Sequence, residues 1–157
     1  MMNGRARDLP GQNGEGRSER ETALDLEVGL RVEEYRWVEW NRRALGRTPL
    51  HEPGRFVGHP GDLLAHLYEE TSEDTPLSED AYARLPRYST RTGPALRAAE
   101  RAGVFADEGA RLSCTPGGVW HLSLERAGLD LENESLPRLL CRAALRLADR
   151  RAGGARG

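Results

Sequence analysis

The sequence contains no lysine and no isoleucine, and all 23 of its basic residues are arginine. Because codons for lysine and isoleucine are AT-rich, we interpret both absences as the base composition of a GC-rich genome, of bacterial or phage origin. The arginine content by itself is therefore no evidence for phosphate binding. The 25 acidic residues bring the formal net charge to -2, so the chain has no overall basic field for nucleic acid.

Cysteine and long apolar runs are also scarce. The two cysteines, Cys114 and Cys141, are too few for a disulfide framework or a cysteine metal site, and we expect both to behave as small apolar side chains. No apolar run approaches the roughly 18 residues of a membrane helix. The first twenty residues lack the apolar segment of a secretory signal. The sequence predicts a soluble cytoplasmic protein without a membrane partner, in a bacterium or a phage-infected cell.

A chain of 157 residues is about the length of one domain. Glycine and arginine with few apolar residues predict a disordered tail over residues 1–20, and residues 153–157 are expected to fray. Residues 21–152 are expected to form a single α+β domain. Within it, residues 41–85 are rich in turn-forming and acidic residues, which indicates a variable insertion.

The spacing of apolar residues predicts the order of the elements. Thr22 and Asp25 have the spacing of a capping box at the start of a first helix, and alternation around residues 36–40 predicts a strand. The later elements are expected to be a short helix over Asp62–Glu70 inside the insertion, a helix after residue 90, a hairpin with strands at 110–115 and 119–124, and a last helix from 135 to about 152. The order helix-strand-insertion-helix-hairpin-helix predicts a small antiparallel sheet flanked by helices, as in an α/β/α sandwich.

No pattern in the sequence marks a catalytic site. A phosphate-binding loop, a nucleophile elbow and a cysteine with a neighbouring histidine are all missing, so no catalytic residue and no cofactor are assigned. The best metal-like set is His59, Asp62 and His66, because Asp62 and His66 would share one face of the predicted short helix. Such a set would support a metal-dependent hydrolase. Against this reading, Asp62 is already expected to cap that helix.

The last predicted helix carries the largest local basic feature of the chain. Arginine recurs at every fourth position, at Arg138, Arg142, Arg146 and Arg150. This row could bind phosphates or an acidic protein partner, or it could stabilise the helix C-terminus and keep the surface solvated. As a partner site, the row would suit a structural or assembly protein, and it leaves an oligomer open. The acidic net charge gives no strong signal for nucleic acid.

Several short segments carry a resemblance to a known family. They are Pro-Arg-Tyr-Ser-Thr at 86–90, Cys-Arg-Ala-Ala-Leu at 141–145, the helical segment LDLEVGLRV, and a tryptophan-containing stretch at 36–40. Their order resembles that of the phage ABA sandwich domain family, small proteins of phages and prophages. The resemblance covers residues 22–36 and 86–150. It implies a sheet flanked by helices and implies no reaction.

The ligand-binding hypothesis concerns four residues at the start of the helix after residue 90, namely Tyr88, Ser89, Thr90 and Arg91. A helix N-terminus offers backbone N–H groups and a positive dipole to a phosphate, and Arg91 would add a cation. The resembled family usually has an aspartate at the position of Arg91. We therefore expect a non-enzymatic accessory protein, derived from a phage or prophage, that binds a protein partner or a small ligand. One form of it would be a sponge for a nucleotide-derived host defence signal.

Overall fold

The computed structural model describes residues 16–45 and 53–156, and most of the expected N-terminal tail lies outside these residues. The chain forms two compact units. The first unit contains Glu34–Leu85 with the residues up to Thr22, and the second contains Ala23–Glu33 with Pro86–Gly157. Each unit holds one three-stranded antiparallel sheet. Helices with antiparallel sheets confirm the α+β class, although the strands form two sheets where the sequence suggested one.

Helix α1 (Glu19–Arg31) begins earlier than the sequence analysis predicted. The Ser18 hydroxyl accepts a hydrogen bond from the Glu21 N–H at 3.1 Å, and the Glu21 carboxylate accepts one from the Ser18 N–H at 2.9 Å. This reciprocal pair is a capping box. The capping box predicted at Thr22 and Asp25 is wrong, because Thr22 donates to the Ser18 carbonyl within the helix and Asp25 is completely buried.

In the first unit, the central strand confirms the predicted strand and its neighbours come from the supposed insertion. The elements are β1 (Arg36–Trp40), α2 (Arg42–Leu45), β2 (Phe56–Gly58), the 3-10 helix η2 (Ala65–Leu67) and β3 (Tyr68–Glu70). The strand order is β2-β1-β3. Val38, Trp40, Phe56 and Ala81 form its buried apolar cluster, with Tyr68 packed against them. Residues 41–85 therefore supply both outer strands of the sheet.

The short helix predicted over Asp62–Glu70 is wrong. Only one turn of 3-10 helix forms, and Tyr68 then adopts an extended backbone and pairs with Trp40 of β1. The ring of Tyr68 lies 5.0 Å from that of Trp40 and 5.2 Å from that of Phe56. Packing of these aromatic rings explains why strand pairing prevails over the helical spacing of the leucines before it.

The second unit contains the remaining elements, which are α3 (Thr92–Ala102), the 3-10 helix η3 (Val104–Ala106), β4 (Ala110–Cys114), β5 (Trp120–Leu124), β6 (Leu129–Asn133) and α4 (Leu136–Arg156). The predicted hairpin is confirmed as β4 and β5, and β6 adds a third antiparallel strand that the sequence analysis missed. Helix α4 continues to Arg156, well into the segment that was expected to fray.

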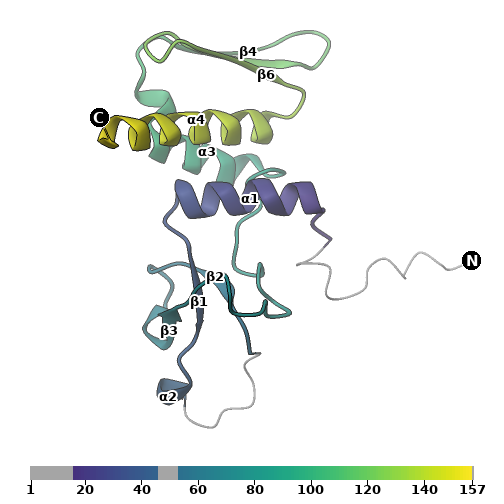
Figure 1. The fold of residues 1–157 in the computed structure, drawn as a ribbon. Coiled ribbons are helices and arrows are strands. Elements are labelled where there is room, and N and C mark those ends of the chain that lie inside the picture. Colours follow the sequence, from purple (N-terminus) through teal and green to yellow (C-terminus); the bar gives the residue numbers. More distant parts are fainter. Residues whose placement is uncertain (1–15, 46–52, 157) are drawn as a thin grey trace, which may run out of the picture. The chain divides into compact units, whose positions relative to one another are not determined.

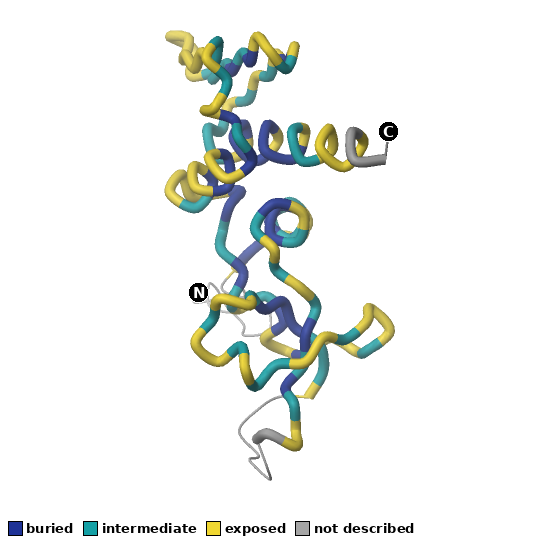
Figure 2. The backbone as a smooth tube through the Cα atoms, turned by 90° about the vertical axis from the view of Figure 1, so that its left-hand side faces the viewer, coloured by how far each residue is buried: buried dark blue, intermediate teal, exposed yellow. Residues whose placement is uncertain are grey.

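Helices α3 and α4 pack against each other. The buried residues of α3 are all alanines, at positions 95, 98, 99 and 102. Gly103 has a positive φ of 91° and ends α3 in the left-handed conformation. The sheet lies on one side of α4 (Figure 1). Buried residues of α4 are concentrated in its N-terminal half, whereas the described part of its C-terminal half is mostly exposed (Figure 2).

Candidate functional site

The four residues of the ligand hypothesis divide into a buried pair and an exposed pair. Tyr88 and Ser89 are almost completely buried, whereas Thr90 and Arg91 are exposed. The Ser89 N–H donates a 2.6 Å hydrogen bond to the Asp25 carboxylate. The Tyr88 hydroxyl lies 3.5 Å from a carboxylate oxygen of Glu33. The buried pair thus holds this segment against α1 and the turn that follows it.

Arg91 stands at the N-cap position of α3, and its side chain makes no capping hydrogen bond. The backbone N–H of Arg91 is bonded to the Arg87 carbonyl, in a turn that precedes the helix. A phosphate at this end would therefore meet only two of the four residues directly. The carboxylates that contact Tyr88 and Ser89 would also repel an anion in the buried part of the segment.

Of the proposed metal ligands, His59 and Asp62 lie close together and their side chains are engaged in local contacts. The His59 ring accepts the Gly61 N–H at 2.8 Å and lies 4.8 Å from the Tyr35 ring. Asp62 accepts the Leu64 N–H at 2.9 Å. His66 belongs to η2, so the predicted helical face that would join it to Asp62 does not form. In residues 16–45 and 53–156, no three histidine, cysteine or acidic side chains are placed to hold a metal ion.

Asp62 instead forms a polar anchor beside the aromatic cluster. Its second carboxylate oxygen accepts the Tyr68 hydroxyl at 2.8 Å and lies 3.8 Å from the Arg84 guanidinium. The hydrogen bond from Leu64 is the main cause that lowers the pKa of Asp62, and burial opposes it. Burial and the bond to Asp62 together raise the pKa of Tyr68 to about 12. These two groups stabilise the first unit and carry no sign of proton-transfer chemistry at neutral pH.

The arginine row of α4 is exposed at all four positions. The side chains of Arg138, Arg142 and Arg146 form no hydrogen bond or ion pair with any other described residue. Arg150 differs, because its guanidinium donates a hydrogen bond to the Ala127 carbonyl in the turn between β5 and β6. The structure thus separates the row into three available arginines and one that holds a neighbouring turn.

Within α4 itself, the one acidic side chain is ion-paired and the one thiol is buried. Asp149 forms an ion pair with Arg31 of α1, so it does not neutralise the three available arginines. Burial, with a smaller effect from the Asp25 carboxylate, raises the pKa of the Cys141 thiol to about 12. Cys141 therefore stays protonated and is unsuited to act as a nucleophile. Cys114 lies exposed on β4.

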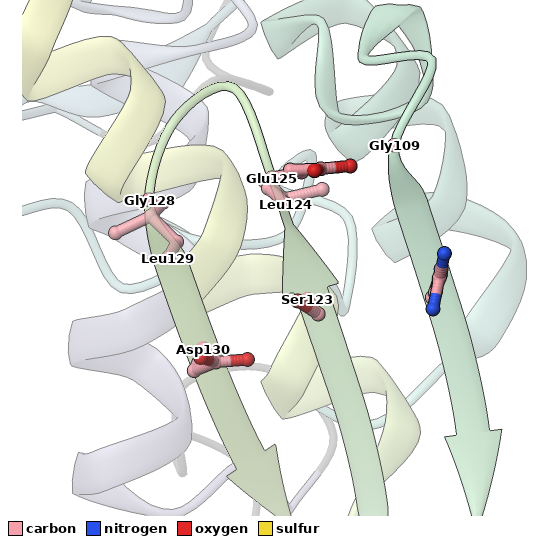
Figure 3. Close-up of a pocket in the computed structure, with 8 residues that line it drawn as sticks. Gly109, Ser123, Leu124, Glu125, Gly128, Leu129 and Asp130 are labelled. Carbon is pink, nitrogen blue, oxygen red and sulfur yellow. The ribbon is translucent and has the colours of Figure 1, made fainter.

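A polar pocket that the sequence analysis did not predict lies at one end of the β4-β5-β6 sheet (Figure 3). Its cavity volume is about 350 Å³, at the lower end of the range for small-molecule sites. Its lining includes two glycines and four polar side chains, namely Gly109, Gly128, Arg111, Ser123, Glu125 and Asp130. A sequence signal was present only in part, since the alternation of leucine and acidic residues at 129–132 could have indicated β6.

One carboxylate joins the two turns that form the rim of this pocket. Asp107 accepts hydrogen bonds from the N–H of Gly109 at 2.8 Å and, across the rim, from those of Arg126 at 3.0 Å and Ala127 at 3.4 Å. Arg126 also lies 3.6 Å from the Glu108 carboxylate. The contact from Arg150 to Ala127 supports the same turn from α4.

None of the described helices is long and apolar enough to cross a lipid bilayer. Comparison of the chain with protein-family models, with curated proteins and with solved structures finds no significant match.

Proposed function

We propose that this chain is a non-enzymatic binding protein whose α4 arginine row binds an acidic segment of a protein partner. The observation that carries the proposal is the row of three exposed guanidiniums at Arg138, Arg142 and Arg146, none paired with a carboxylate of the described chain. Side chains four residues apart on a helix are about 6 Å apart along its axis. A partner helix with carboxylates at the same interval would match the row.

A protein partner is favoured over nucleic acid by the charges around the row. The chain has a formal net charge of -2. The β4-β5-β6 sheet of the same unit carries the exposed acids Asp130 and Glu132. A polyanion that extended beyond α4 would be repelled by these groups, whereas a short acidic segment would contact only the arginines.

The proposal that the protein is non-enzymatic rests on the burial and placement of its reactive side chains. Cys141 is a buried thiol with a raised pKa, and His59 and His66 are not joined into a metal site with Asp62. The version in which Tyr88, Ser89, Thr90 and Arg91 hold a nucleotide-derived ligand has less support, because two of these residues are buried against carboxylates. The phage or prophage origin rests on the sequence resemblance alone.

A charge-reversal experiment tests the proposal. The probe is a fluorescent helical peptide with glutamate at every fourth position, compared with a scrambled peptide of the same composition. We expect the triple variant Arg138→Glu, Arg142→Glu, Arg146→Glu to lose binding by tenfold or more.

The matched control changes three other exposed arginines, Arg20, Arg42 and Arg43, to glutamate, so it has the same net charge as the α4 triple variant. This control should bind as the unchanged protein does. Equal loss in both triple variants would show a general charge effect and would contradict the assignment to α4. Binding that is insensitive to salt between 50 and roughly 300 mM would contradict it too, since exposed ion pairs are screened over about 8–10 Å.

A further inference from the structure

The pocket at the end of the β4-β5-β6 sheet brings opposite charges together without pairing them. Strand register places Arg111 opposite Ser123, and Ser123 opposite Asp130. Ser123 lies on the face away from the buried neighbours Leu122 and Leu124, so this row faces out of the apolar core. Arg111 and Asp130 are two strands apart, about 10 Å between their Cα atoms.

The charged groups of this pocket have no partners within the described chain. The side chains of Arg111, Glu125 and Asp130 form neither a hydrogen bond nor an ion pair with any residue of 16–45 and 53–156. In the next row on the same face of the sheet, by contrast, His121 lies 3.3 Å from Glu132. The pocket therefore presents one cationic side chain, Arg111, and two anionic side chains, Glu125 and Asp130, that remain available for a ligand.

Glycine keeps the pocket open where the carboxylate of Glu125 lies. A Cβ atom at Gly109 would come within 2.6 Å of both the Cβ and the Oε2 of Glu125. Figure 3 shows the Glu125 side chain extending toward Gly109. Any other residue at position 109 would displace Glu125, because a 2.6 Å approach is far inside van der Waals contact.

The two turns that form the rim of the pocket are held in place by hydrogen bonds from their backbone N–H groups to the Asp107 carboxylate. This carboxylate joins the turn before β4 to the turn between β5 and β6, from which Glu125 and Gly128 line the cavity. Gly128 has a positive φ of 64° within that turn. A frame fixed in this way lowers the ordering cost of binding a small molecule.

From this geometry we propose that the pocket binds a small zwitterion that carries a carboxylate and an ammonium group, as a free α-amino acid does. Arg111 would form a bidentate contact with the ligand carboxylate. Asp130 and Glu125 would accept hydrogen bonds from the ammonium group. Ser123 lies between Arg111 and Asp130 in the strand register. The cavity of about 350 Å³ is large enough for a molecule of this size.

A ligand that carries only one kind of charge fits these three charged side chains less well. A phosphate or another simple anion at Arg111 would face the carboxylates of Asp130 and Glu125. A simple amine would gain no contact with the Arg111 guanidinium and would be repelled by its charge. Only a molecule that carries both a negative and a positive group can pair with Arg111 and with the carboxylates of Glu125 and Asp130 at the same time. This site is separate from the α4 surface, so the two proposals can fail independently.

The test is a binding screen on the full-length protein by saturation-transfer NMR and calorimetry, with the twenty common amino acids as probes. The best amino acid is then compared with its decarboxylated amine and with its deaminated acid. We expect at least one amino acid to bind with a Kd below about 1 mM, and both single-charge analogues to bind at least tenfold more weakly. No binding by any amino acid, or equal binding of the amine or the acid, overturns the proposal.

Two variants place the ligand in the pocket. Arg111→Gln removes the cationic side chain of the pocket. Gly109→Ala displaces Glu125, because the added Cβ atom would overlap with that side chain. Both should weaken amino-acid binding by tenfold or more. The matched control Arg126→Gln removes an equal charge from the adjacent turn, outside the lining of the cavity, and should leave the Kd unchanged. If Arg111→Gln binds as tightly as Arg126→Gln, the pocket is not the site.

A readout of folding keeps this comparison valid. Arg111 is exposed on an edge strand and makes no side-chain contact that the fold depends on, so Arg111→Gln should melt within about 2 °C of the unchanged protein. Loss of binding with the melting temperature retained supports the proposal. Retained binding in this folded variant refutes it, whatever Gly109→Ala does.

Discussion

Removal of the Asp107 carboxylate should loosen the end of the β4-β5-β6 sheet. This side chain accepts the N–H groups of Gly109, Arg126 and Ala127 at 2.8, 3.0 and 3.4 Å. A hydrogen bond to a charged group contributes about 1.5–3 kcal/mol net, and partly exposed ones lie at or below the low end. For three such bonds, one of them long, we expect Asp107→Ala to lower the free energy of unfolding by about 3 kcal/mol.

For a chain of this size, 1 kcal/mol corresponds to roughly 2–4 °C in melting temperature. Asp107→Ala should therefore melt roughly 6–12 °C lower, as measured by circular dichroism. The amide protons of Gly109, Arg126 and Ala127 should exchange faster with solvent than in the unchanged protein.

A neighbouring substitution serves as the control. Glu108→Gln breaks only the exposed ion pair with Arg126, and such pairs contribute at most about 1 kcal/mol. It should leave the melting temperature within about 2 °C. If Asp107→Ala and Glu108→Gln have the same small effect, Asp107 does not hold the rim, and the argument for a preformed pocket is refuted.

Two further predictions concern titratable groups. A maleimide reagent should modify Cys114 within minutes at pH 7.5 and leave Cys141 unmodified until the protein unfolds, since Cys114 is exposed and burial raises the pKa of Cys141 to about 12; equal modification of both in the folded protein, by mass spectrometry, would contradict this. Because the pKa of Asp62 is lowered in the fold, its stabilising effect is present above its ordinary value of 3.8 and is lost as pH falls through the folded value. Asp62→Asn should therefore flatten the acid limb of stability against pH, and an unchanged acid limb in denaturant titrations would show that Asp62 is not responsible.

The sequence predicted best what depends on neighbouring residues. The α4 helix and its exposed arginines follow from periodicity along a single element, as does the hairpin from its turn residues. The start of α1 was missed because Ser18 and Glu21 form the same box as the pair four residues later, and only the burial of Asp25 decides between them.

The features that were missed depend on contacts between distant segments. Tyr68 becomes part of a strand because it packs on Trp40 and Phe56, which no local pattern records. Arg111, Ser123 and Asp130 form a row only through the register of three strands. The burial of Tyr88 and Ser89 likewise depends on a distant segment, since Asp25 of α1 and Glu33 of the turn after α1 contact them.

The central claim, that the α4 arginine row binds an acidic protein segment, is tested most directly by exchanging the charges of both partners. The triple variant at Arg138, Arg142 and Arg146 carries glutamate on α4, and the probe peptide carries lysine in place of glutamate. Fluorescence anisotropy should show that the unchanged protein binds only the glutamate peptide and that the variant binds only the lysine peptide. If the unchanged protein and the variant bind the glutamate peptide equally, the row is not the binding surface and the account is contradicted.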